Sequence, residues 1–597
     1  MRQSQLSVHS ENILPIIKKW LYSERDIFVR ELVSNATDAL TKMRYLELDS
    51  GPFTIDVAID KEAKTISFID TGIGMTEEEV EKYIAQIAFS GAQEFASKYQ
   101  SNKEPMIGHF GLGFYSSYMV ASKVEIQTLS YLPNSTPVFW SCDGSSSYSI
   151  GAGTKLTRGT AIILHLDEEN LEYLEENKLR TLLNRYCKFM PFPISLNGAP
   201  MNNSEPLWQK APSECTDNEY RECYRQLFPM DPDPLFWVHL NVDYPFHLKG
   251  ILFFPKNNRR FDGEEGAIKL FCNKVFVSDN CKEILPDYLM ALKGALDSSD
   301  IPLNVSRSYL QVDQNVKQLS THIAKKVADR LSLLLKTEKD RYIDAWSEIE
   351  LFLKLGILQD VKFYDRAKEL LIWKNSEESW TTVEEYLERA KEKKVFYSTL
   401  TEKTPLLQLY KEKNLEILFA TTPIDTALIQ FLEEKLSTSF QRIDGACPAD
   451  LLDATREKSL LDADGRSQAA KIADFIRGSL DQKDLEVEAK SLASDNLPAL
   501  LIVDENQRRF RDYLVLTQGK QANSPIQPKK SFIVNTNNCL VQAIERLSSS
   551  EPQLAKELSK SLYHLSLLGQ REVKPGDLEQ LLAQQMTVLE KLAALIP

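Results

Sequence analysis

The chain has 597 residues, 26% charged and 43% hydrophobic, fractions typical of globular proteins that exclude a largely disordered or fibrous chain. This length is too great for one hydrophobic core and predicts several domains. Lys and Arg number 71 against 85 Asp and Glu, and the resulting net charge of -14 has the wrong sign for a protein that lives on nucleic acid.

Targeting signals and cysteine spacing give the next exclusions. No run of about 18 uninterrupted apolar residues occurs, and residues 1–12 lack the basic-then-apolar pattern of a signal peptide. We therefore expect a cytoplasmic protein that binds no membrane. No two of the eight cysteines are separated by just two residues, as zinc sites prefer, so we expect reduced thiols and no metal clip.

The N-terminal part predicts an α+β domain over residues 1–203. Its apolar periodicity first indicates a helix from Asp26 to Leu48. Gly, Pro, Asn and Ser in residues 197–205 predict a short linker at its end. Strand-like runs at 53–59, 65–69, 123–129, 137–141 and 160–166 and a helical stretch at 171–187 complete the domain.

Two further domains follow. Residues 204–460 predict an α/β domain, with strands at 239–242 and 250–254, long helices over 316–356 and a strand–helix–strand unit over 394–420 that is typical of a parallel crossover. Residues 468–597 predict a helix-rich domain. Two apolar stripes in it are either intramolecular core or a helical dimer interface: Leu554, Leu558, Leu562 and Leu565, then Leu578, Leu582, Leu589, Leu592 and Ile596.

The first predicted helix carries a polar stripe. Glu31, Asn35, Asp38 and Lys42 are spaced four, three and four residues apart, so they share one helix face. Such a stripe is either the solvated face of an amphipathic helix or a row of ligand-binding groups. The helix by itself leaves both interpretations open.

Two glycine-containing turns follow the helix. Residues 70–75, Asp-Thr-Gly-Ile-Gly-Met, come directly after a predicted strand, where the Asp70 carboxylate can accept a hydrogen bond from an exocyclic amine such as adenine N6. Residues 108–116, Gly-His-Phe-Gly-Leu-Gly-Phe-Tyr-Ser, expose backbone N–H groups that suit phosphate oxygens. Each turn alone is a weak signal, because ordinary turns use the same residues.

The order of these motifs is specific. A helix with Glu and Asn four apart, an Asp-x-Gly-x-Gly turn, a second glycine-rich loop and then Gly159-Thr160 entering a strand resemble one ATP-binding fold. Heat-shock chaperones of ninety kilodaltons, type II topoisomerase ATPase subunits, mismatch-repair ATPases and sensor histidine kinases share it. The longer strings at 26–40, 107–116 and 301–307 resemble the ninety-kilodalton heat-shock chaperone family in its bacterial form. That resemblance covers nearly the whole chain and weakens towards the end.

The resemblance implies Mg²⁺-dependent ATP hydrolysis. It makes Asn35 the Mg²⁺ ligand, Glu31 the general base and Arg307, from the second domain, the catalytic arginine near the γ-phosphate. Residues 86–106 match the family's mobile lid over ATP. Besides Asn35, the implied nucleotide-binding residues are Asp38, Lys42, Asp70, which would read adenine, Gly74, Met75, Gly108, Gly111, Gly113, Phe114 and Thr160.

The family's architecture and partners are implied as well. Its fold is an N-terminal ATPase sandwich of helices on a mostly antiparallel sheet, an α/β middle domain and a helix-rich C-terminal dimerisation domain. We expect a homodimer whose ATP-driven clamp opens and closes around unfolded or partly folded client proteins, with ATP and ADP as ligands and other chaperones as further partners. The charged interdomain linker and acidic C-terminal pentapeptide of the eukaryotic cytosolic forms are absent, so their co-chaperones are not expected.

Some positions depart from the family pattern. Phe89 stands where the family usually has lysine, Ala92 where it has threonine, and His109 where it has glutamine. A nucleotide-gated scaffold that binds ATP without turnover therefore stays an alternative. A mismatch-repair or topoisomerase-type ATPase is another, but it should add a basic DNA channel, which the acidic balance disfavours. A sensor histidine kinase needs a phosphoacceptor histidine before the ATPase domain, where only His9 occurs.

Overall fold

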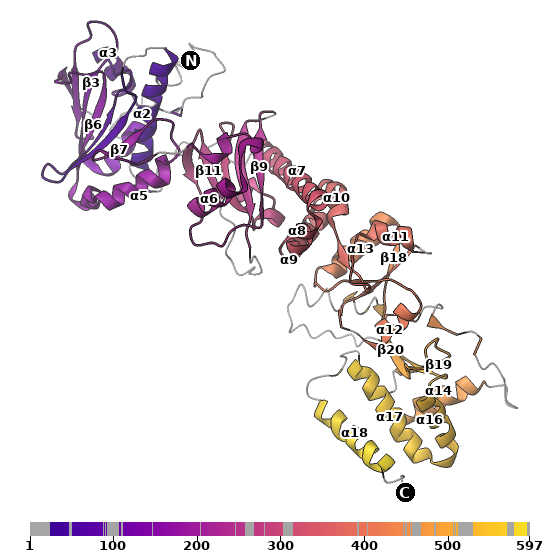
Figure 1. The fold of residues 1–597 in the computed structure, drawn as a ribbon. Coiled ribbons are helices and arrows are strands. Elements are labelled where there is room, and N and C mark those ends of the chain that lie inside the picture. Colours follow the sequence, from indigo (N-terminus) through magenta and orange to yellow (C-terminus); the bar gives the residue numbers. More distant parts are fainter. Residues whose placement is uncertain are drawn as a thin grey trace, which may run out of the picture. The chain divides into compact units, whose positions relative to one another are not determined.

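The structure, a computed structural model, describes two compact units, Met1–Arg330 and Leu331–Pro597 (Figure 1). The described residues run from 24 to 593 apart from 47–50, 88, 90, 92–106, 109–110, 146, 203–204, 245, 257–267, 280, 302–313, 391–392, 403, 446, 448–450, 454, 457–466, 481, 483–484, 506, 508, 511–528, 570–572 and 574–577.

The first unit begins with an eight-stranded sheet in the order β5-β4-β3-β6-β2-β1-β7-β8. Its neighbouring strands are antiparallel except β1 and β7, which run parallel. This confirms the predicted mostly antiparallel sheet with helices. The strands are β1 Ile55–Asp60, β2 Thr65–Asp70, β3 Ala121–Leu129, β4 Val138–Cys142, β5 Ser149–Ala152, β6 Gly159–Leu166, β7 Ile194–Leu196 and β8 Ala199–Pro200.

Helix α2 (Ile27–Tyr45) packs on this sheet and on helix α5 (Glu176–Cys187). Phe28 is completely buried and makes edge-on ring contacts with Phe68 of β2 and with Tyr173. The apolar side of α2 is therefore fixed to the core, as its 3.6-residue periodicity predicts. The remaining helices of this part are α3 (Glu77–Tyr83) and the 3-10 helices η2 (Gly113–Met119) and η3 (Glu168–Leu174).

The predicted linker at residues 197–205 is wrong at its beginning. Asn197 and Gly198 have φ values of +51° and +81° and form the turn between β7 and β8, the last strand of the sheet. The side chain of Asn197 also accepts a hydrogen bond from the Ile59 amide at 3.0 Å. The turn-forming residues that suggested a linker serve a hairpin instead, because Asn-Gly suits two successive positive φ angles.

A second sheet of the first unit has the order β12-β11-β13-β10-β9. Trp208 is 1% exposed and joins it to the end of the first sheet's core, with ring centroids 4.9 Å from Phe189 and 5.2 Å from Phe271. The strands of this second sheet are β9 Phe236–Val242, β10 Leu248–Phe254, β11 Ile268–Cys272, β12 Val275–Ser278 and β13 Lys293–Asp297. The helices of the same part of the chain are η4 Leu207–Gln209, η5 Pro212–Glu214, α6 Asp217–Leu227, η6 Lys282–Ile284, η7 Asp287–Leu289 and α7 Gln314–Thr337.

The second unit contains the predicted parallel crossover. Strands β16 (Lys394–Ser398) and β17 (Ile417–Phe419) pair in parallel and are joined through helix α12 (Pro405–Glu412). Strand β18 (Ser439–Arg442) pairs in parallel with the other side of β16 and completes this three-stranded sheet. The other elements of this part are α8 Lys339–Asp344, α9 Trp346–Gln359, α10 Val361–Ala367, η8 Lys368–Leu370, β14 Trp373–Lys374, β15 Trp380–Thr381, α11 Val383–Arg389 and α13 Asp425–Leu436.

The C-terminal part of this unit has a three-stranded sheet, β19-β21-β20, that sequence periodicity did not predict. The helices that it predicted are present. In α17, Leu554, Leu558 and Leu562 are buried. In α18, Leu581 and Val588 are buried, whereas Leu578, Leu582, Met586, Leu589 and Leu592 are exposed. The elements are α14 Gln468–Ser479, β19 Leu485–Lys490, β20 Ala499–Val503, β21 Lys530–Asn535, α16 Cys539–Ser550, α17 Pro552–Gly569 and α18 Leu578–Ala593.

Among the described residues, no helix is long and apolar enough to cross a bilayer.

Candidate active site

The polar stripe of α2 is not a solvated face. Glu31 is 6% exposed and Asp38 is 5% exposed, while Asn35 and Lys42 are half-buried. Buried carboxylates are costly unless they are paired or hydrogen-bonded, so their partners define what this face does.

Glu31 lies between an arginine and the glycine-rich loop. Its Oε1 accepts hydrogen bonds from Nε and Nη2 of the buried Arg30 at 3.1 and 3.0 Å. On the other side, a Cβ at Gly113 would lie 2.6 Å from Glu31 Oε2, so any larger residue there would displace this carboxylate. Sequence reasoning missed Arg30, because a charged residue next to Glu31 gives no sign that it is buried.

Asp38 anchors the start of the same loop. Its Oδ1 accepts a hydrogen bond from the Ile107 amide at 2.8 Å, and its Oδ2 accepts one from the Gly108 amide at 2.7 Å. The two carboxylates of α2 therefore contact the loop at both of its ends, Asp38 at Gly108 and Glu31 at Gly113. The sequence predicted Asp38 as a nucleotide contact, whereas the structure shows it bonded to the loop backbone.

Asp70 ends β2 in a buried network. Its Oδ1 accepts hydrogen bonds from the Gly72 amide at 2.8 Å and the Thr160 amide at 3.3 Å. Burial raises the pKa of Asp70 to about 6, against the smaller lowering effects of these two amides and of the charges of Lys155 and Arg158. A carboxyl that is expensive to ionise is typical of a functional site.

Thr128 extends this network, and the sequence did not predict it. Its hydroxyl lies 3.0 Å from the Thr160 hydroxyl and accepts a hydrogen bond from the Met75 amide at 2.9 Å. Gly74, between Asp70 and Met75, has φ +63°, and a Cβ there would lie 1.9 Å from the Leu129 carbonyl oxygen. The Asp-x-Gly-x-Gly turn is therefore closed onto β3 and β6 by contacts that only glycine permits.

The remaining predicted residues are placed as follows. Phe114 is buried at the start of η2, and Gly111 lies beside the backbone of Phe89. Arg307, His109, Ala92 and most of residues 86–106 lie outside the described residues. The structure therefore brings together Glu31, Asp38, Gly108 and Gly113 around the loop, and Asp70, Met75 and Thr160 around the turn. Asn35 and Lys42 lie on α2, the helix that carries Glu31 and Asp38.

Phe89, which stands where the family usually has lysine, is exposed but contacts Tyr83 and Lys82. Its ring centroid is 6.3 Å from that of Tyr83, and the Lys82 ammonium lies 5.4 Å from the Phe89 ring centre and 5.0 Å from the Tyr83 ring centre. The Phe89 ring is 43% exposed, and the cation–π contact with Lys82 can offset part of the free-energy cost of leaving it in water.

Within the described residues, no group of three or more His, Cys, Asp or Glu side chains is arranged to hold a metal ion. All eight cysteines are free thiols. The oxygen donors on α2, Asn35 above all, are nevertheless of the kind that Mg²⁺ takes together with phosphates and waters.

The chain matches two family models. One, described as Hsp90 protein, matches residues 197–589, and the other, described as Histidine kinase-, DNA gyrase B-, and HSP90-like ATPase, matches residues 22–149. The second match contains α2, the Asp70 turn and the glycine-rich loop. The first covers the chain beyond this ATPase part and rules out the DNA-acting branches.

Similar proteins agree over nearly the full length. The chain is 38% identical to Chaperone protein HtpG of Porphyromonas gingivalis over 97% of this chain and 89% of that protein. It is 38% identical to the Bacteroides fragilis HtpG over 91% of this chain and 84% of that protein. It is 29% identical to the mitochondrial TNF receptor-associated protein 1 homolog of Dictyostelium discoideum, over 92% and 80%. The chain belongs to the Hsp90 family, and it is an ATP-hydrolysing molecular chaperone of the HtpG type.

Proposed function

We propose that ATP binds between the Asp70 turn and the glycine-rich loop and that Asp70 reads the adenine. Both backbone donors to Asp70 bond Oδ1, so Oδ2 is the atom that accepts the adenine amine. Thr160 supports this position through its amide and its hydroxyl. The amides of residues 108–114 contact the phosphates, with Lys42 on the same side of α2.

Two of the proposed catalytic groups, Asn35 and Glu31, lie on α2. Asn35 holds Mg²⁺, and the ion, when bound, neutralises phosphate charge and orients the γ-phosphate. Glu31 accepts the proton of the attacking water through Oε2, because Arg30 occupies Oε1. Arg307 supplies positive charge to the transferred phosphoryl group.

The single observation that carries this proposal is the double contact between α2 and the loop. Because Asp38 bonds Ile107 and Gly108 while Glu31 lies against Gly113, the helix that carries the base also fixes the loop that contacts the phosphates. Base and phosphates are then positioned by one rigid element, as positional catalysis requires.

We further propose the division 1–203, 204–460 and 468–597, for ATP binding, for the catalytic arginine and client contacts, and for dimerisation. The exposed apolar side chains of α18 support the last: Leu578, Leu582, Met586, Leu589 and Leu592 are between 36% and 59% exposed. Such a stripe requires a partner surface, and a second copy supplies an identical helix. The dimer opens and closes on client proteins in the cytoplasm, with other chaperones as further partners.

The test compares wild type with Glu31→Ala. Mg²⁺-dependent phosphate release is measured beside ATP binding by calorimetry, with and without EDTA. We expect slow turnover by wild type, and binding without turnover by Glu31→Ala. Equal turnover of the two proteins would remove Glu31 as the base. EDTA-insensitive turnover would remove Mg²⁺, and binding without turnover by both would favour a nucleotide-gated scaffold.

A further inference from the structure

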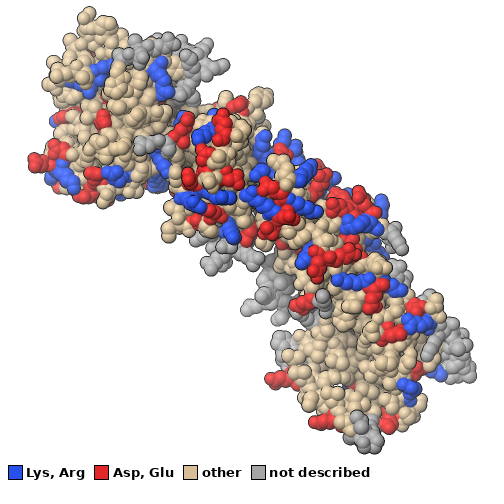
Figure 2. All heavy atoms as spheres, viewed as in Figure 1, with Lys and Arg blue, Asp and Glu red and all other residues tan. Residues whose placement is uncertain are grey.

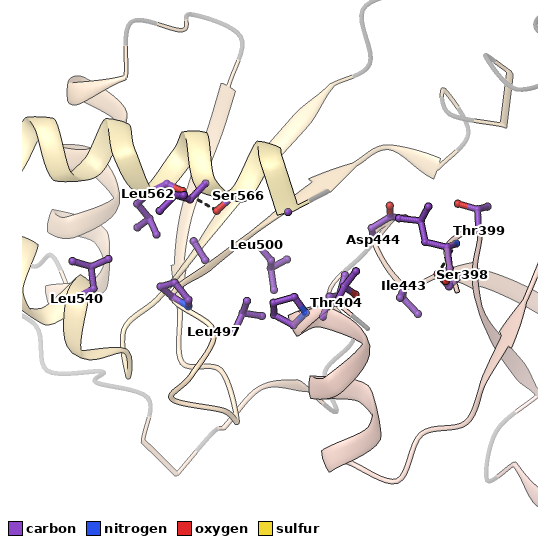
Figure 3. Close-up of a pocket in the computed structure, with 17 residues that line it drawn as sticks. Ser398, Thr399, Thr404, Ile443, Asp444, Leu497, Leu500, Leu540, Leu562 and Ser566 are labelled. Atoms are coloured by element: carbon purple, nitrogen blue, oxygen red, sulfur yellow. Dashed lines mark hydrogen bonds between the residues drawn. The ribbon is translucent and has the colours of Figure 1, made fainter. Parts of the chain in front are cut away.

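A cavity of about 230 Å³ lies in the second unit and contains none of the proposed ATP-binding residues (Figure 3). Its walls come from the ends of β16 and β18, the start of α12, the start of β20, and helices α16 and α17. Leu406, Ile443, Leu497 and Leu500 belong to one buried core cluster. Leu562 of α17 belongs to a second cluster, against which Leu540 of α16 packs. The cavity is therefore lined by side chains of both clusters of the second unit.

The polar side chains that line the cavity have hydrogen-bond or ion-pair partners within the protein, although the ion pair of Asp444 with Arg442 does not have the geometry of a hydrogen bond at Asp444 Oδ1. The hydroxyls of Ser398 and Ser566 donate to the Leu400 and Leu562 carbonyl oxygens, the latter within α17 (Figure 3). The carboxylate of Asp444 pairs with Arg442 at 2.8 Å. Similarly, Thr399 Oγ1 accepts from Arg442 at 2.7 Å and Thr404 Oγ1 from the Leu407 amide at 3.2 Å.

The rest of the lining consists of Gly569 and of apolar residues, namely Leu400, Pro405, Leu406, Ile443, Leu497, Pro498, Ala499, Leu500, Leu540, Leu562 and Leu565. With the polar groups bonded, an occupant gains by burying apolar surface and loses if it brings a polar group that needs a partner. The lining therefore selects an apolar occupant.

The volume of the cavity and the residues at its rim indicate what size of apolar group can occupy it. An apolar cavity of about 150 Å³ is enough to bind benzene, and drug-sized ligands need about 300 Å³ or more. At about 230 Å³ this cavity has room for one large side chain. Leu565 extends the apolar surface outward, because it is 50% exposed while its neighbour on α17, Leu562, is 2% exposed.

We propose that this cavity docks a single large apolar side chain, such as Leu, Phe or Trp, from a partly folded client. The proposal rests on the chaperone function and adds the place and the chemistry of one client contact. Partly folded proteins expose the large apolar side chains that native proteins bury. Figure 2 shows few charged side chains over the C-terminal elements at the lower right of that view.

The probe for this contact is a Gly/Ser peptide with one central benzoylphenylalanine, cross-linked by light to the full-length protein without nucleotide. Mass spectrometry maps the attachment sites. We expect cross-links to α17 and the start of β20, and competition by the same peptide with Phe but not with Ser. Cross-links on other surfaces, or competition by the Ser peptide, would contradict the proposal.

Two substitutions at one position provide the matched test. Ser566→Phe places a ring in the cavity and should abolish cross-linking, whereas Ser566→Ala removes only a hydroxyl bonded inside α17 and should keep it. Equal labelling of the two variants would refute the cavity as the site. Thermal unfolding shows whether Ser566→Phe is folded.

Leu565 supplies a second measurement that needs no filling of the cavity. Leu565→Ser should lower the affinity of the protein for the Phe peptide about tenfold. Leu333→Ser alters another leucine that is 50% exposed and should leave this affinity unchanged. Equal effects of both variants would mean general apolar adsorption. Conversion of the protein to monomers by Leu565→Ser would assign this leucine to the subunit interface and overturn the proposal.

ATP hydrolysis is measured on the same samples to separate the two proposals. Cross-linking of the peptide to α17 in a protein that does not hydrolyse ATP would overturn the ATPase mechanism but not the proposed client contact. A protein that hydrolyses ATP but labels elsewhere would overturn the pocket alone.

Discussion

Replacing Asp70 by asparagine should remove ATP binding and at the same time stabilise the ligand-free protein. Asp70 Oδ1 accepts two backbone hydrogen bonds, which the asparagine oxygen can keep. The amide replaces only Oδ2, the oxygen assigned to adenine, with a donor. The variant therefore loses the base contact but no longer buries a charge.

The size of this stabilisation follows from the pKa. Burial raises the pKa of Asp70 to about 6 from 3.8. Between these values the native state binds the proton that the unfolded state has released, so native stability falls as pH rises from about 4 to 6. The full cost of ionising Asp70 above pH 6 is about 3 kcal/mol, about half of which is already present at pH 5.

Hydrogen exchange of the β2 and β6 amides measures this effect in the full chain. The stability gain of Asp70→Asn over wild type should grow by about 1.4 kcal/mol, or tenfold in protection, between pH 5 and pH 8. Asp60→Asn is the control, because exposed Asp60 also accepts two backbone amides through one oxygen. A pH-independent gain, or ATP affinity retained by Asp70→Asn, would refute the reasoning.

Other substitutions test the remaining contacts. Glu31→Ala should bind ATP within about threefold of wild type by calorimetry but release phosphate at least about 100-fold more slowly, and a smaller loss would mean that another group is the base. Asp38→Ala leaves two loop amides without their acceptor and should weaken ATP binding by about 10- to 100-fold, whereas unchanged binding would show that the loop holds itself. Gly74→Ala adds backbone strain at φ +63° and a steric overlap with the Leu129 carbonyl, so the free energy of unfolding of the N-terminal domain should fall by about 2–5 kcal/mol in calorimetry. An unfolding transition like that of wild type would mean that the turn can move. The double variant Leu582→Asp and Leu589→Asp should be monomeric by light scattering if α18 forms the dimer, and a persisting dimer would place the interface elsewhere.

Local patterns in the sequence predicted much of the fold. The helix predicted at 26–48 is found at Ile27–Tyr45, and the strand–helix–strand unit predicted at 394–420 is a parallel crossover. These predictions succeed because periodicity reports which side of a segment is buried. Asn197-Gly198 failed as a linker signal because the same two residues serve a hairpin turn, and only pairing between distant segments distinguishes the two.

The sequence by itself determined the family and the residue types of the site, because Glu31, Asn35, Asp70 and the glycine-rich loop are local motifs in a fixed order. Their partners were decided only by tertiary structure. The pairing of Asp38 with Ile107 and Gly108 joins positions about 70 residues apart, and Thr128 meets Thr160 across two strands. The raised pKa of Asp70 likewise comes from burial, and burial depends on chain packing that no local pattern records.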